Sequence, residues 1–286
     1  LEPSNVTTGF ANLVGDFTQN NRLGRNFAYG VREFPMGTIN NGIALHGGLE
    51  VFGATFFVFS DYERPAIRLR ALQGLPVVSE YTHDSIFVGE DGPTHQPVEH
   101  LMACRAIPNL LVLRPGDANE AIVASRIAFE QTNRPALVLL TRQGLPVFDR
   151  NTYPSAEEFR KGGYIMQNCE GAPEVVIIAT GSEVWVALEA AEKISENKVR
   201  VVNMGCWELF DEQSLEYRQS VLGDESALRV SIEAGVTLGW EHYTGLNGLN
   251  IGINTFGESA PGGEVADHFG ITPEKVADKI QKYINS

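Results

Sequence analysis

"LPVVSEYTHDSIFVGEDGPTHQP", residues 75–97, joins an apolar run to a loop that is crowded with titratable side chains. The loop holds two histidines and three acids, and four glycines or prolines punctuate it. Ligands of open parallel sheets bind beyond the carboxyl ends of the strands, which is where this loop would lie. The stretch therefore predicts a buried strand followed by a functional site, although a solvated surface turn is the alternative interpretation.

The same alternation of apolar runs and helical spacing extends along the chain. In the first half, the apolar runs are residues 52–59, 75–81, 110–115 and 135–142. Short apolar strands between helices are typical of parallel sheets that helices cover on both faces. The helix after 110–115 has a predicted N-cap at Asp117, with Glu120 three residues later. The pattern predicts an α/β fold with open, doubly wound and mainly parallel sheets.

A polar stretch rich in Pro and Gly interrupts this pattern, and the break predicts two domains. We expect a first domain at residues 1–147, a linker at 148–163 and a second, smaller domain at 164–286. Beyond the linker the apolar runs resume as EVVIIATG, VRVVNMG and LRVSIEAG. Each of the two domains is therefore expected to be an open, doubly wound α/β unit.

The composition of the chain argues against some classes of binding partner and indicates its cellular environment. The net charge of −14 and the pI of about 4.9 argue against nucleic acid, which requires clustered Lys and Arg. Three widely spaced cysteines without a Cys-x-x-Cys pair favour a reducing, cytoplasmic location. No apolar run approaches the roughly 18 residues of a membrane span, so no membrane partner is expected. The chain begins at Leu1 without a signal-peptide pattern or an initiator methionine, which suggests a fragment of a longer protein.

Three further groups of side chains are candidate site residues, each with a structural alternative. Glu33 follows an arginine at an expected helix start, where a buried ion pair or a helix-start acid is the favoured interpretation. Phe56, Phe59 and Tyr62 would ordinarily be core residues, but they could also enclose a planar heterocycle. Arg142 ends an apolar run, where it could bind an anion or form a surface salt bridge.

The order and spacing of several stretches carry a resemblance to a known family. In the first half they are YGVREFPMG (29–37), GATFFVFSDYERPAIRLRAL (53–72), THDSIFVGEDGPTHQPVEHL (82–101), PNLLVLRP (108–115) and LTRQ (140–143). The second half adds ATGSEV (179–184) and GLNGLNIGINTFGESAP (245–261). Together they closely resemble transketolase, over essentially the whole chain.

The resemblance implies an assignment for each domain. Residues 1–147 resemble the pyrimidine-binding domain and residues 164–286 the C-terminal domain, whereas the family's N-terminal diphosphate-binding domain has no counterpart here. The implied activity is that of a transferase of the pentose phosphate pathway. With thiamine diphosphate, it moves a two-carbon ketol unit from a ketose phosphate to an aldose phosphate. The Mg²⁺ ligands are expected on the missing domain, so no metal ligand is assigned in this chain.

The resemblance also implies roles for individual side chains. Glu33 matches the catalytic glutamate that hydrogen-bonds the aminopyrimidine ring of the cofactor, and His95 matches a histidine that supports proton transfer at the substrate's carbonyl centre. The residues implied to surround the cofactor ring are Phe56, Phe59 and Tyr62. The residues implied to bind the substrate, including its terminal phosphate, are Ser4, His83, Asp91, His95 and Arg142.

The family's architecture implies the partners. The chain is expected to form a homodimer through its pyrimidine domain, to need a diphosphate-binding domain or subunit, and to be inactive alone. One alternative is a related ketol transferase such as dihydroxyacetone synthase. Another is a non-catalytic dimerisation or regulatory module, which the presence of Glu33 and His95 disfavours because such a module does not require them.

Overall fold

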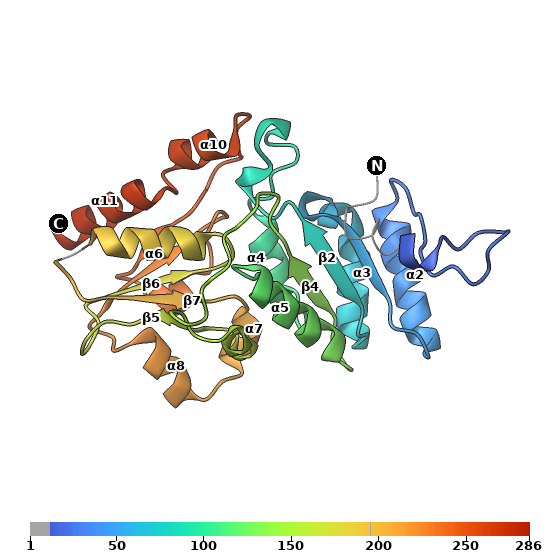
Figure 1. The fold of residues 1–286 in the computed structure, drawn as a ribbon, viewed down its shortest axis with the longest axis horizontal. Coiled ribbons are helices and arrows are strands. Elements are labelled where there is room, and N and C mark those ends of the chain that lie inside the picture. The colour runs from blue at the N-terminus through green and yellow to red at the C-terminus, as the bar shows by residue number, and fades with distance from the viewer. Residues whose placement is uncertain (1–11, 195) are drawn as a thin grey trace.

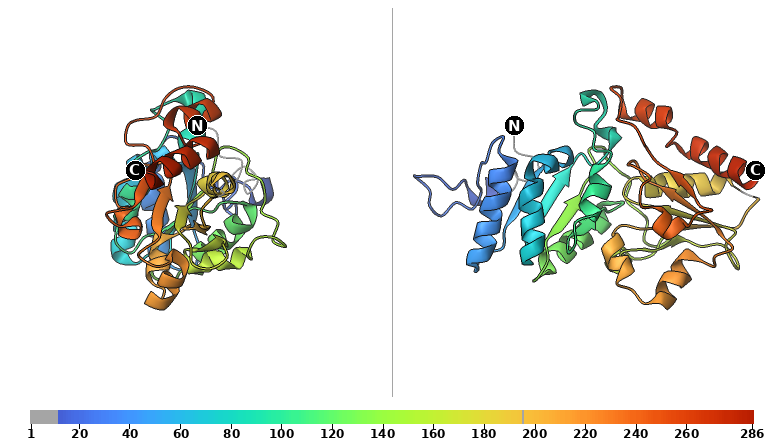
Figure 2. Two further views of the ribbon diagram at one scale, coloured as in Figure 1. Left: turned by 90° about the vertical axis from the view of Figure 1, so that its left-hand side faces the viewer. Right: turned by 180° about the vertical axis from the view of Figure 1, so that it is seen from behind.

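Two α/β units lie side by side at opposite ends of an elongated molecule (Figure 1). The computed structural model describes residues 12–194 and 196–286. Seen from behind, the blue-to-green first unit and the yellow-to-red second unit are separated in the same way (Figure 2). The α/β fold with mainly parallel sheets that the sequence predicts is confirmed.

The first unit contains a four-stranded sheet in the order β1-β2-β4-β3, and all of its strands are parallel. The strands are β1 (Phe52–Phe56), β2 (Val78–Thr82), β3 (Leu111–Leu113) and β4 (Ala136–Leu139). Each strand is shorter than its apolar run; after β1, for example, Phe57–Phe59 form a 3₁₀ turn, η1. Because the strands are parallel, their carboxyl ends meet at one edge of the sheet, where the loop of residues 83–96 begins.

Helices cover both faces of this sheet because neighbouring strand residues point to opposite cores. Val112 packs with α3 (Ser60–Gln73) and α4 (His100–Arg105) on one face. Leu113 packs with α5 (Ala118–Glu130) on the other face. The first unit is therefore doubly wound.

The helix starts follow local capping rules. Asp117 accepts a hydrogen bond from the backbone nitrogen of Glu120 at 2.8 Å, so the predicted N-cap of α5 is confirmed. The helix α2 (Glu33–His46) lies beside α3 at the outer end of the first unit (Figure 1). Glu33 is its first residue, where a carboxylate also favours the helix dipole.

The second unit contains a five-stranded sheet in the order β5-β7-β6-β8-β9, in which only β5 is antiparallel to its neighbour. The strands are β5 (Tyr164–Gln167), β6 (Val175–Ala179), β7 (Val199–Asn203), β8 (Leu228–Ile232) and β9 (Leu249–Ile251). Helices α6 (Glu183–Lys193) and α11 (Pro273–Ile284) cover one face, and the other face carries α7 (Trp207–Asp211), α8 (Leu215–Leu222) and α9 (Glu241–Thr244). The remaining helix, α10 (Gly262–Phe269), lies against the 83–96 loop of the first unit (Figures 1 and 2).

The segment 148–163, which we expected to link the two domains, contributes to the core. It contains the 3₁₀ turn η3 (Ala156–Lys161). Phe148 and Phe159 are completely or almost completely buried, and both belong to a hydrophobic cluster that extends from α5 into the second sheet. The two units therefore share one continuous apolar core.

A buried ionic network also joins the two units. Arg105, the last residue of α4, donates to the two carboxylate oxygens of Glu233 at 2.8 and 2.7 Å. Arg114, just beyond β3, binds Asp84 at 2.8 Å and also pairs with Glu183 at the start of α6. None of these five side chains is more than 3% exposed. Each buried charge is therefore stabilised by its ionic partner, because water cannot reach the charge and take the partner's place.

Two observations bear on the expected environment of the chain. Within residues 12–194 and 196–286, no helix has the length and apolar character that a membrane crossing requires. All three cysteines are free, with Cys104 and Cys206 buried and Cys169 partly exposed.

Replacing Arg105 with Met should lower the free energy of unfolding by about 3–5 kcal/mol, because Glu233 would keep a buried charge without its main partner. Guanidinium denaturation followed by circular dichroism measures this change. Arg134→Met is the matched control, since it removes another pair between the two units, with Glu212, whose side chain is 52% exposed. The control should cost less than about 1 kcal/mol. An equal loss in the two variants would contradict the importance of the buried network.

Candidate active site

The carboxyl edge of the first sheet gathers side chains from three neighbouring strands. Phe56 is the last residue of β1, His83 directly follows β2, and Arg142 lies shortly after β4. The strands run in register, with Phe56 opposite Thr82. Three predicted site residues that are far apart in sequence therefore lie at one end of the sheet.

Aromatic rings form a continuous series at this edge. The ring of His83 stacks on Phe56 with centroids 3.6 Å apart, and Phe56 stacks on Phe59 at 5.9 Å. Phe59 in turn contacts Tyr62 at 6.2 Å and meets the ring of His95 edge-on at 5.6 Å. The structure thus brings both predicted histidines into contact with the predicted aromatic trio.

The charged candidates surround His83. Burial lowers the pKa of His83, and the positive charge of Arg142 lowers it further, whereas Asp91 acts in the opposite direction. His95 also contributes to this lowering, so all four side chains lie close enough to interact electrostatically. His83 has a φ of 62°, a left-handed conformation that histidine adopts more readily than most residues do. The group can therefore present two imidazoles, a carboxylate and a guanidinium to one ligand.

Glu33 lies on a different element, at the start of α2, and it is 8% exposed. The arginine before it does not form the ion pair that local sequence suggested, because Arg32 donates to the carbonyl of Tyr29 at 2.9 Å. Within the described part of the chain, the Glu33 carboxylate has no hydrogen-bonding or ionic partner. It is thus a nearly buried acceptor that is available to a ligand.

A cleft of about 1280 Å³ connects Glu33 with the aromatic residues. Glu33, Phe56 and Phe59 all line it. Asn40 also lines it and is completely buried, yet its side-chain nitrogen has no hydrogen-bond partner among the described residues. Tyr62 is 65% exposed and does not line the cleft, although it contacts Phe59. The cleft therefore offers apolar ring surfaces and the nearly buried Glu33 carboxylate, with the unpaired Asn40 side chain in its wall.

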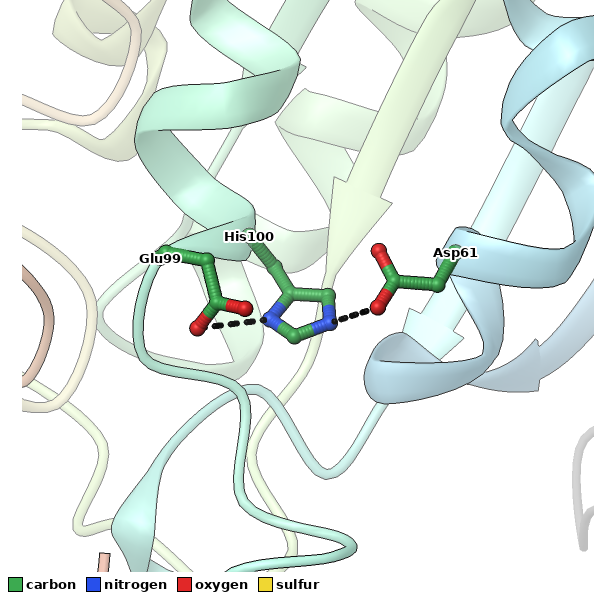
Figure 3. Close-up of side chains that lie close together, drawn as sticks. All are labelled: Asp61, Glu99 and His100. Atoms are coloured by element: carbon green, nitrogen blue, oxygen red, sulfur yellow. Dashed lines mark ion pairs between the residues drawn. The ribbon is translucent and has the colours of Figure 1, made fainter. Parts of the chain in front are cut away.

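One group of potential metal ligands occurs in the described residues, and it lies outside this cleft. His100 stands between Asp61 and Glu99, with one ring nitrogen 3.1 Å from Asp61 and the other 3.7 Å from Glu99 (Figure 3). One ligand atom from each of the three residues lies within 4.8 Å of the other two, although the two carboxylates face opposite ring nitrogens of His100. The arrangement is that of an imidazole bridging two carboxylates.

Two buried residues hold the 83–96 loop in a way that sequence reasoning did not predict. Asp84 is 1% exposed and binds Arg114, and Gln96 is 3% exposed and donates to two backbone carbonyls. Asp84 is one of the three acids that the sequence placed in the candidate loop, but without an anchoring role, whereas Gln96 gives no sequence signal. The predicted substrate residue Ser4 lies outside the described residues.

Two family models together match most of the chain. The transketolase pyrimidine-binding domain family matches residues 3–147, and the transketolase-like C-terminal domain family matches residues 162–272. Transketolase from Aquifex aeolicus is 54% identical over 268 residues, which are 93% of this chain and 39% of that protein.

Solved structures show the same relationship. A transketolase from Pichia stipitis, in complex with sedoheptulose-7-phosphate, is 41% identical with a TM-score of 0.88, and the match covers 94% of this chain and 40% of that one. A split-gene transketolase, described as an inactive β4 tetramer, matches 96% of this chain and 89% of its own with a TM-score of 0.72. At 23% identity, that second likeness is one of fold alone.

The chain thus spans about two fifths of the length of the full transketolases that it matches. The matched regions are the pyrimidine-binding and C-terminal parts, as the resemblance implied. The chain belongs to the transketolase family.

Proposed function

We propose that this chain supplies the pyrimidine-binding half of a transketolase active site. The observation that carries the proposal is the Glu33 carboxylate, nearly buried and without a partner, in a cleft lined by stacked aromatic rings. Apart from its favourable position at the start of α2, this carboxylate forms no hydrogen bond or ion pair with another described residue. A ligand that donates a hydrogen bond would explain its retention in an apolar cleft.

The cleft fits the aminopyrimidine ring of thiamine diphosphate. Glu33 would accept a hydrogen bond from the ring, Asn40 with its unpaired amide nitrogen lines the same cleft, and Phe56 and Phe59 would cover the planar face. The chemistry supplied by thiamine diphosphate, when it is bound, is a nucleophilic carbon that carries the two-carbon ketol unit between sugars. Glu33 would hold the ring in place and move a proton at its hydrogen-bonded nitrogen.

The group around His83 would bind the sugar phosphate. His95 would contact the oxygen at the reacting carbonyl and move its proton, while Asp91 would accept a hydrogen bond from a nearby hydroxyl. Arg142 forms no ion pair within the described residues, so its exposed guanidinium is available for the terminal phosphate, with His83 and Ser4. The related Pichia stipitis enzyme is described in complex with sedoheptulose-7-phosphate, which supports this class of ligand.

Other parts of the site would come from other polypeptides. We place the Mg²⁺ and diphosphate ligands on a diphosphate-binding domain or subunit, and the split-gene transketolase offers a precedent for such a division. The first unit exposes many large apolar side chains that would suit a homodimer interface, among them Leu13, Leu23, Phe34, Leu45, Leu49 and Leu72. Three free cysteines and an acidic composition fit a cytoplasmic enzyme of the pentose phosphate pathway.

Two alternative functions differ from this proposal in the residues that they would need. A related ketol transferase such as dihydroxyacetone synthase would use the same cleft but would not need Arg142 for its acceptor. A non-catalytic dimerisation or regulatory module would need neither Glu33 nor His95.

Glu33→Gln should reduce ketol transfer by a factor of about 10²–10⁴, because the amide cannot accept and return a proton as the carboxylate does. The assay combines the chain with a transketolase diphosphate-binding polypeptide, thiamine diphosphate and Mg²⁺, and the chain without that polypeptide should be inactive. Glu50→Gln is the matched control, since Glu50 lines the same cleft but is exposed. Full activity of Glu33→Gln, or activity of the chain alone, would contradict the proposal.

The chain should also be a dimer in solution through its first unit, because a dimer would cover the exposed apolar side chains there. Sedimentation equilibrium of the wild-type chain should give twice the mass of 31.3 kDa. Leu45→Asp, on the exposed side of α2, should shift the protein towards the monomer, whereas Leu246→Asp in the second unit should not. A monomeric mass of the wild-type chain at high concentration would be evidence against the interface.

The titration of His83 should respond to its neighbours. NMR should give a His83 pKa below 6.5, which Arg142→Met raises by removing a positive charge and Asp91→Asn lowers further. Because folding lowers this pKa, the stability linked to neutral His83 is full above about pH 6.5 and is lost as pH falls through the folded-state pKa. Inorganic phosphate bound between Arg142 and His83 should raise the pKa. No response to either replacement would show that the four side chains do not form one group.

A further inference from the structure

The 83–96 loop, which carries Asp91 and His95, is held at several points by contacts that lead to the second unit. We propose that the second unit clamps this loop at three points, and that Gln96 is a positioning residue for Asp91 and His95. The inference rests on the proposed function for the roles of those two side chains. It assigns a task to the C-terminal unit, which contributes no residue to the cleft itself.

The first point of the clamp is at the start of the loop. Asp84 binds the guanidinium of Arg114 at 2.8 Å, and both side chains are almost completely buried. Arg114 in turn donates to the backbone oxygen and the hydroxyl of Thr180, at 2.9 and 2.7 Å, and pairs with Glu183. Through Arg114, the residue next to His83 is thus attached to the β6–α6 turn of the second unit.

The second point is at the tip of the loop. The hydroxyl of Ser259 donates to the backbone oxygen of Glu90 at 2.6 Å. Gly92, with a φ of 75°, faces Ser259 so closely that a Cβ at Gly92 would lie 3.1 Å from the serine Cβ. The backbone on both sides of Asp91 therefore rests on the segment that precedes α10.

The third point is at the end of the loop, directly after His95. The side-chain nitrogen of Gln96 donates to the carbonyls of Gly89 and Glu258, both at 2.9 Å. There is no free space around this amide, because a Cβ at Gly257 would lie 1.7 Å from the Gln96 side-chain oxygen. One buried amide thus closes the loop on itself and attaches it to the second unit.

The position of the two functional side chains follows from these anchors. Asp91 is exposed and His95 is half-buried, so their own contacts do little to restrain the backbone that carries them. Gly89 and Gly92 both have positive φ, and glycine gives the free chain many other conformations at these positions. Side chains that bind a substrate act efficiently when a surrounding shell holds them in place, and here the second unit provides that shell.

Gln96→Met tests the clamp in the chain itself, because it keeps the side-chain volume and removes both donated hydrogen bonds. Amide hydrogen exchange of residues 85–95 should become at least about ten-fold faster. Ser259→Ala, an exposed site that does not threaten folding, should accelerate exchange around Glu90. Gln213→Met is the matched control. It removes a single hydrogen bond of 2.9 Å, which the side-chain amide donates to the Leu209 carbonyl in the second unit. Unchanged exchange of the loop in the folded Gln96 and Ser259 variants would overturn the proposal.

Kinetics of the reconstituted enzyme separate positioning from general destabilisation. Gln96→Met should raise the KM for the sugar phosphate about ten-fold and leave the Kd for thiamine diphosphate within two-fold, because Glu33 lies on α2 outside the clamp. An equal rise in the KM for the sugar phosphate and the Kd for thiamine diphosphate, or an unchanged KM, would contradict a positioning role. If the wild-type mixture transfers no ketol unit, the proposed function fails, while hydrogen exchange still decides whether the clamp exists.

Discussion

The burial of Arg114 between the two units is the interaction on which the rest of the structure depends. Its guanidinium is inaccessible to water and holds Asp84 of the first unit together with Glu183 of the second. Burial raises the pKa of Glu183, and the charge of Arg114 opposes that rise, so the carboxylate relies on this one arginine. The second pair, Arg105 with Glu233, is just as deeply buried and repeats the arrangement nearby. These buried charges favour one relative position of the two units, since separating the units would break the Arg105–Glu233 and Arg114–Glu183 pairs.

That fixed position gives the two units different tasks. The first unit supplies the cleft and the carboxyl edge of its sheet, where parallel strands bring Phe56, His83 and Arg142 together. The second unit supplies no cleft residue, but it holds Asp84 through Arg114 and binds Gln96 directly, and it thereby supports the loop between them. In the function that we propose, the cleft would bind the cofactor ring and the clamped loop would bind the sugar.

The parts of this arrangement that follow from local pattern could be predicted from the sequence. Alternating apolar runs and helices predict the parallel sheets, and Asp117 with Glu120 predicts the start of α5, because these signals act within a few residues. The contact of Gln96 could not be predicted, since its acceptor is a backbone carbonyl 162 residues away and any residue carries such a carbonyl. Glu33 shows the same limit at short range. Its neighbour Arg32 suggested an ion pair, but the turn before α2 directs that arginine to the carbonyl of Tyr29 instead. For Glu33, Asp91 and His95, the resemblance to transketolase supplied roles that residue chemistry alone left open.

The most direct test of the central claim is an experimental structure of the chain combined with a diphosphate-binding polypeptide and thiamine diphosphate. The account predicts that a carboxylate oxygen of Glu33 lies within about 2.6–3.2 Å of a nitrogen of the aminopyrimidine ring. It also predicts that the ring packs against Phe56 and Phe59 in the cleft. A cofactor bound elsewhere, or a Glu33 carboxylate turned away from a ring that occupies the cleft, would contradict the account.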